Sequence, residues 1–145
     1  MKFNPLKIAG VVLVLILVPG TVKWWKRISY ESTVSKRVVA TRRSLPHPVQ
    51  PRIMQTGIEL HGHLLKSRFE TDYAFDATPE LTAEMTRSIK GSVCDDADHR
   101  DMLEHGYTFE QTFDRAVGTG GLPRGAGTLT VNVSAADCPG VTVRR

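Results

Sequence analysis

The apolar run from Leu6 to Val22 constrains the fold of this 145-residue chain more than any other feature. Lys7 is the only charged residue in the run. Together with the three residues that follow it, the run would form a helix of about 30 Å, which is the thickness of a bilayer core. Cationic and indole side chains suit the headgroup region at both ends of such a helix. These membrane-interface residues are Lys7, Lys23, Trp24, Trp25, Lys26 and Arg27. The sequence therefore predicts a transmembrane anchor over residues 1–25, with the lipid bilayer as a partner, and a cleaved signal peptide is the alternative.

Charge divides the chain into two unlike parts. Residues 1–52 contain ten Lys and Arg and one acid, Glu31, whereas residues 53–145 contain nine Lys and Arg and fourteen Asp and Glu. The two parts therefore carry formal charges of +9 and −5. A nucleic-acid-binding domain is expected to have positive charge on its folded part. The acidic second part argues against nucleic acid as a partner, and a basic nucleic-acid-binding arm is the alternative for the first part.

Residues 26–52 are interpreted as a basic stalk and linker. The stretch 28–40 has a weak helical pattern that could continue the anchor. Prolines at 46, 48 and 51 then remove amide donors and favour extended backbone, so residues 41–52 are expected to be a semi-rigid linker. The cations of the segment are expected to lie near anionic lipid headgroups. No sustained heptads mark the stalk, so the sequence leaves the oligomeric state open.

Residues 53–145 are predicted to form a small α+β domain. Alternating apolar residues indicate strands over residues 65–76, 107–117 and 129–133. Capping and spacing predict one helix from Thr78 to Gly91 and a second from Asp95 or Asp96 to Gly106. The predicted fold is an N-terminal transmembrane helix followed by an antiparallel sheet of three or four strands, packed with two helices. The glycine-rich stretch 118–127 is interpreted as a hairpin loop, because a strand and not a helix follows it.

The two cysteines lie far apart in the predicted domain. A bond between Cys94 and Cys138 would close a ring of about 45 residues and so restrict the unfolded chain. A structural disulfide is favoured because no C-x-x-C motif occurs, while a catalytic thiol or half of a metal site are competing interpretations. A disulfide requires an oxidising compartment, whereas the cations after the apolar run favour a cytoplasmic domain.

Histidines and acids give a weaker signal for a metal site. His61 and His63 could present two imidazoles on one face of an extended segment, and His99 and His105 could join them around zinc. The acids between Asp95 and Asp101 lack the glycine and the terminal glutamate of an EF-hand, and helix capping explains them more simply. No nucleophile, base and orienting group occur in a recognisable arrangement. The sequence therefore predicts neither an enzyme nor a cofactor or metal site.

From Leu65 onward the chain resembles a known group of proteins. The similarity consists of a strand ending at Tyr73 and Phe75, a capped helix, the pattern C-x-D-x-x-x-R-x-x-L-x-x-G from Cys94 to Gly106, an aromatic strand, a glycine turn and a strand leading to Cys138. It resembles small, uncharacterised, membrane-anchored envelope and prophage proteins of Gram-negative bacteria with a paired-cysteine periplasmic domain. The resemblance implies a Cys94–Cys138 disulfide and a periplasmic location, and it carries no catalytic residues.

Together these features predict a single-pass inner-membrane protein whose C-terminal domain lies in the periplasm. We expect it to act as an accessory or binding protein of the cell envelope, through contact with an envelope or phage protein. Exclusion and envelope assembly are candidate processes, and the sequence leaves the choice between them open. The alternative is a metal-dependent periplasmic enzyme or binder that uses His61 and His63.

Overall fold

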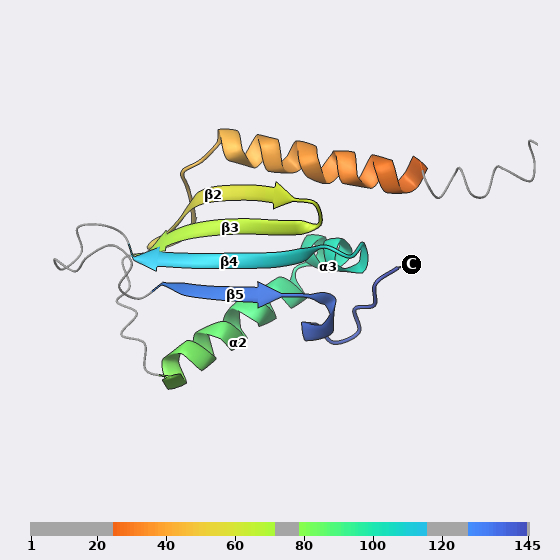
Figure 1. Cartoon of the computed structure of the whole chain (residues 1–145). Coiled ribbons are helices and arrows are strands. Elements are labelled where there is room, and N and C mark those ends of the chain that lie inside the picture. The colour runs from red at the N-terminus through yellow and green to blue at the C-terminus, as the bar shows by residue number, and fades with distance from the viewer. Residues whose placement is uncertain (1–24, 72–78, 116–127, 145) are drawn as a thin grey trace, which may run out of the picture. The chain divides into compact units, whose positions relative to one another are not determined.

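The structure is a computed structural model, and it describes residues 25–71, 79–115 and 128–144. The chain divides into two compact units, Met1–Val39 and Ala40–Arg145. The described part of the first unit is helical, and the second unit contains a sheet with two helices (Figure 1). The N-terminal anchor predicted over residues 1–25 lies outside the described residues except for Trp25.

Residues 25–43 form a continuous helix where the sequence predicts only a weak helical stalk. No glycine or proline interrupts this stretch, and Arg27 lies 3.3 Å from Glu31 one turn further on. The helix ends shortly before Pro46, because a proline disfavours helical backbone at the residue that precedes it. Among the described residues, no helix combines the length and the apolar character needed to cross a membrane.

Five strands form one sheet in the order β1-β2-β3-β4-β5. They are His47–Gln50 (β1), Ile53–His61 (β2), Leu64–Thr71 (β3), Thr108–Arg115 (β4) and Leu129–Val133 (β5). Neighbouring strands are antiparallel except for β3 and β4, which are parallel. A parallel pair requires a crossover connection, and helices α2 (Pro79–Asp95) and α3 (Ala97–Glu104) lie in it (Figure 1).

The predicted antiparallel sheet of three or four strands is therefore wrong in both strand number and strand direction. Alternating apolar residues identify β3, β4 and β5, but this alternation is the same for parallel and antiparallel neighbours. The direction depends on the connection. Two helices separate β3 from β4, which leaves room for the chain to return and start β4 beside the start of β3.

Strands β1 and β2 were not predicted, each for a physical reason. β1 lies in the proline-containing segment that the sequence suggested was a linker, and Pro48 is tolerated there because β1 is an edge strand. β2 does not follow period two along its whole length, since a bulge between Gln55 and Gly57 shifts its register. Gly57 fits this position because a Cβ atom there would lie 3.2 Å from the Cβ atom of Arg68.

The two helices of the second unit agree with the sequence in position but not in every boundary. Helix α3 starts at the second of the two predicted positions, because the side chain of Asp96 accepts a hydrogen bond from the backbone N–H of His99 at 2.9 Å and so caps the helix. Helix α2 does not end at Gly91, as predicted, but continues to Asp95. Tertiary packing holds its last turn, where Val93 is only 2% exposed.

Gly91 offers a simple test of that longer helix. A Cβ atom at this position would meet no heavy atom within 4 Å, so alanine fits without strain. Replacing Gly91 by alanine is expected to raise the free energy of unfolding by about 0.5–1 kcal/mol, because alanine loses less backbone entropy in a helix. Urea unfolding followed by circular dichroism measures the change. A lower midpoint for the variant would mean that α2 ends near residue 91 in solution.

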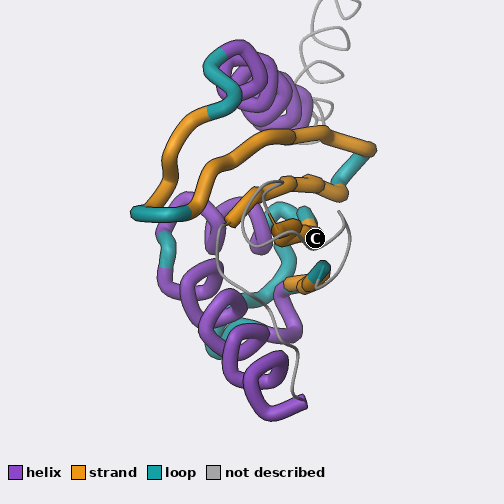
Figure 2. The backbone as a smooth tube through the Cα atoms, turned by 90° about the vertical axis from the view of Figure 1, so that its left-hand side faces the viewer, coloured by secondary structure: helices purple, strands orange, loops and turns teal. Residues whose placement is uncertain are grey.

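Helices α2 and α3 lie on one face of the sheet (Figures 1 and 2). The core lies between these helices and the sheet, and it includes the buried side chains of Leu65, Val93, Met102, Leu103, Phe109, Phe113, Val131 and Val133. The other face of the sheet is polar. There Lys66 lies 3.1 Å from Glu110 and Arg68 lies 3.8 Å from Asp114, across the parallel pair of strands.

Candidate functional site

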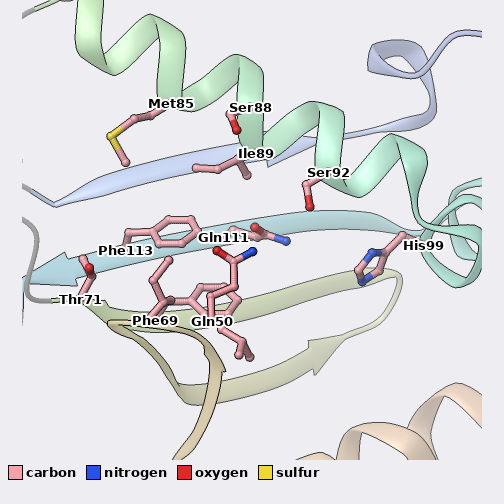
Figure 3. A pocket seen from close by; sticks show the side chains of 12 residues that line it. Gln50, Phe69, Thr71, Met85, Ser88, Ile89, Ser92, His99, Gln111 and Phe113 are labelled. Atoms are coloured by element: carbon pink, nitrogen blue, oxygen red, sulfur yellow. The ribbon is translucent and has the colours of Figure 1, made fainter.

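A cavity of about 400 Å³ lies between helix α2 and the inner face of the sheet (Figure 3). Strands β1 to β4 and both helices contribute to its walls. The described residues that line it are Val49, Gln50, Ile53, Phe69, Thr71, Met85, Ser88, Ile89, Ser92, His99, Gln111 and Phe113. A volume of this size is typical of sites that bind ligands or anchoring side chains.

The floor of the cavity is aromatic. Phe69 of β3 and Phe113 of β4 are direct partners in the parallel register, so their rings stack with centroids 4.8 Å apart and an interplanar angle of 15°. Their direct pairing across β3 and β4 brings them together, since register partners on adjacent strands lie side by side on the same face of a sheet. The floor is therefore fixed by the sheet and does not depend on the flanking loops.

Helix α2 forms the opposite wall. Met85, Ser88, Ile89 and Ser92 follow one another at intervals of three, one and three residues, which places them on one side of the helix, and all four point toward the sheet (Figure 3). Ser88 and Ser92 are exposed at this surface. Two small hydroxyl side chains occupy positions where a filled core would have larger apolar residues, and the cavity remains open beneath them.

One end of the cavity is polar. His99 of α3 lies there, and its ring contacts that of Phe109 edge to face with centroids 5.0 Å apart. Gln111 lies on the floor nearby (Figure 3). Among the described lining residues, His99 is the one that can carry a charge. Because a charged ligand would lose its hydration without gaining a strong counter-ion, the cavity suits an uncharged apolar group with a hydrogen-bonding end.

A disulfide holds helix α2 beside the end of the sheet. Cys94 and Cys138 are bonded, with their Cα atoms 5.2 Å apart, in the pairing that the sequence and the resemblance predict. One turn earlier on α2, the Nζ atom of Lys90 donates a hydrogen bond to Oδ1 of Asp137 at 2.6 Å. Arg100 donates to the backbone carbonyl of Cys94 at 3.2 Å, which satisfies a carbonyl of the last helical turn. These contacts fix one end of the cavity wall.

Asp137 should make the stability of this attachment depend on pH. The hydrogen bond from Lys90 and a second one from the backbone N–H of Ser134 hold the pKa of Asp137 below its ordinary value of 3.8. A lowered pKa in the folded state adds stability above pH 3.8, and this stability is lost as the pH falls through the lowered pKa. Asp137→Asn is therefore expected to be less stable than wild type at pH 7, and the difference should shrink below pH 3.8. Urea unfolding at several pH values measures it, and a difference that stays constant down to pH 2 would contradict it.

The structure engages the histidines in local contacts. His61 lies 2.9 Å from Glu59 and lowers the pKa of that carboxyl, and His63 stacks on Tyr107 with ring centroids 4.5 Å apart. The ring of His105 contacts the backbone oxygen of Asp101 at 2.8 Å. Within the described ranges, no three His, Cys, Asp or Glu side chains are grouped so that they could hold a metal ion.

The predicted membrane-interface residues are described only in part. Lys7, Lys23 and Trp24 lie outside the described residues. Trp25, Lys26 and Arg27 form the first described turn of the N-terminal helix, and the side chain of Trp25 is 67% exposed.

Sequence reasoning did not identify the cavity, although it placed several of its residues. Phe69 and Phe113 are among the alternating apolar residues of β3 and β4, and Met85 and Ile89 have the i, i+4 spacing of an inward helical stripe. The available signal was the pair of serines at 88 and 92, which share the inward side of the helix with Met85 and Ile89. Small polar residues in an inward stripe indicate that the helix is not fully packed there.

Comparison with known proteins identifies the fold. No protein-family model matches the sequence, and no curated protein matches it in sequence. Two solved structures are similar in fold. One is a presumed secreted protein from Pseudomonas aeruginosa, with a TM-score of 0.57 and 16% identity over 78% of this chain and 96% of that one. The other is the pilotin of the type 2 secretion system of Vibrio vulnificus, with a TM-score of 0.57 and 20% identity over 78% of this chain and 94% of that one. At these identities the likeness shows a shared fold.

Proposed function

We propose that this chain is an extracytoplasmic accessory protein of the cell envelope that acts by contact with another protein. The cavity between α2 and the sheet is its docking site and receives an uncharged apolar segment of the partner. The observation that carries the proposal is the open apolar space bounded by Phe69, Phe113, Met85 and Ile89.

Two further observations support a role outside the cytoplasm. The fold is shared with a presumed secreted protein and with a pilotin of a secretion system. The Cys94–Cys138 disulfide is of the kind that persists in oxidising compartments and is rare in the cytosol. A role in envelope assembly or exclusion stays a prediction, as does the absence of catalysis.

The form of the cavity favours a protein segment as its occupant. Aromatic and aliphatic side chains make its floor and walls, while Ser88 and Ser92 are exposed on its helical side. An apolar centre bordered by polar groups is the usual arrangement of protein interfaces, in which one or two apolar anchors fill a pocket on the partner. The scarcity of charge among the described lining residues further favours an apolar segment over a charged one.

Site-specific photocross-linking in intact cells tests this proposal. A benzophenone amino acid at Ser92 lies on the cavity side of α2, whereas the same group at Ala83 lies nine residues away on the opposite, exposed side of the helix. We expect a discrete protein adduct from position 92 and none, or a different one, from position 83. The adduct should disappear when Met85 is also changed to Glu, which places a charge in the cavity.

Two outcomes would overturn the proposal. Identical adducts from both positions would show that α2 contacts its surroundings without using the cavity. A cavity that cross-links only to a small apolar molecule would make the chain a carrier of that molecule and not a protein-binding module.

A further inference from the structure

The N-terminal helix presents an acid-free cationic surface. We propose that residues 25–39 bind the surface of a bilayer that contains anionic phospholipid, lying along the headgroup region and not crossing it. This inference is independent of the docking site on α2, because it concerns a different part of the chain and a different class of partner.

Acidic and basic side chains are unevenly distributed around the N-terminal helix. At 100° per residue, half of the helix circumference contains Trp25, Lys26, Ile28, Ser29, Ser32, Thr33, Lys36, Arg37 and Val39. No acid occurs on this half. Glu31, the single acid between residues 25 and 39, lies on the other half and pairs with Arg27 at 3.3 Å.

The same half of the helix also has exposed apolar side chains. Trp25, Ile28 and Val39 are 67%, 39% and 44% exposed, so the helix offers these apolar side chains to its surroundings. They lie at one side of the same half of the helix, and Lys26 and Arg37 lie at the other. An indole and aliphatic side chains can enter the boundary between headgroups and acyl chains while the cations reach lipid phosphates.

The distribution of net charge favours the N-terminal part of the chain as the part that binds the membrane. Residues 1–52 carry a formal charge of +9, whereas residues 53–145 carry −5. An anionic surface therefore attracts the cationic N-terminal part and repels residues 53–145. Nucleic acid is also anionic, but its phosphate backbone offers no apolar layer for Ile28 and Val39.

Vesicle co-sedimentation of the full chain tests the proposal. Two partition coefficients are measured, one with vesicles that contain phosphatidylcholine and phosphatidylglycerol and one with vesicles of phosphatidylcholine alone. The first is divided by the second, so that any charge-independent binding by residues 1–24 cancels from this ratio. Lys36→Gln with Arg37→Gln is expected to lower this ratio about 30-fold at low salt, since each cation near an anionic surface contributes about 1 kcal/mol. Added salt should lower the wild-type ratio toward that of the variant.

A matched control removes two cations from residues 53–145, the acidic part of the chain. Arg68→Gln with Arg87→Gln gives the same net charge and is expected to leave the ratio within about twofold of wild type, and Lys36→Arg with Arg37→Lys should retain it because the charge is kept. Equal losses in both glutamine variants would overturn the proposal, as would a ratio near one for wild type. Binding to duplex DNA that is tighter than binding to the anionic vesicles, and lost in the same variant, would assign the surface to nucleic acid instead.

Discussion

Reduction of the Cys94–Cys138 disulfide is expected to lower the free energy of unfolding by about 4 kcal/mol. The two cysteines are separated by 44 positions, so the bond removes a large loop entropy from the unfolded chain. A small domain is stable by only about 5–15 kcal/mol, which makes this one of its largest single contributions. Urea unfolding with and without a phosphine reductant measures the difference.

The double variant Cys94→Ala and Cys138→Ala serves as the control for that measurement. It should unfold at the midpoint of the reduced wild type, and reductant should leave its midpoint unchanged. A wild-type midpoint that does not respond to reductant would contradict the structural role of the bond.

Phe109→Ala is expected to destabilise the protein by about 4 kcal/mol, and Phe113→Ala by clearly less. Phe109 is 2% exposed and packs in the filled part of the core, so its removal leaves a void that the surroundings cannot close. Phe113 lines the cavity, and therefore fewer contacts are lost when it is truncated. The contrast between the two variants reports whether the cavity is open in solution.

Urea unfolding of the two alanine variants measures both losses of stability. The two values can be compared if the m-values of the variants equal that of wild type. An equal or larger loss for Phe113→Ala would mean that the cavity is closed in the absence of a partner. In that event α2 packs on the sheet more tightly than the structure shows, and the docking site would have to open before it could bind.

Much of the folded unit could be predicted from the sequence because local patterns determine it. Alternating apolar residues identified β3, β4 and β5, and the adjacent acids Asp95 and Asp96 located the start of α3 to within one residue. The cysteine placement predicted the disulfide that the structure contains. Each of these features depends on residues that are close in sequence or on a chemistry with few alternatives.

The remainder depends on tertiary context, which the sequence pattern does not contain. The parallel pairing of β3 with β4 is decided by the crossover between them, and the bulge at Gly57 hides the inward face of β2. The cavity escaped prediction for a similar reason. Met85 and Ile89 have the spacing of core residues, and only the distance between helix and sheet decides whether such residues fill a core or line an open space.

Binding of the cross-linked partner segment to the purified protein tests the docking site most directly. Its affinity should be measured by calorimetry for wild type, for Ser92→Trp, which places an indole at the cavity, and for Ala83→Trp, which places one on the opposite side of α2. We expect Ser92→Trp to weaken binding by about 30-fold and Ala83→Trp to leave it unchanged, because loss of a central anchor contact typically costs about 2 kcal/mol. Equal affinities for all three proteins would contradict the assignment of the cavity as the site where this protein meets its partner.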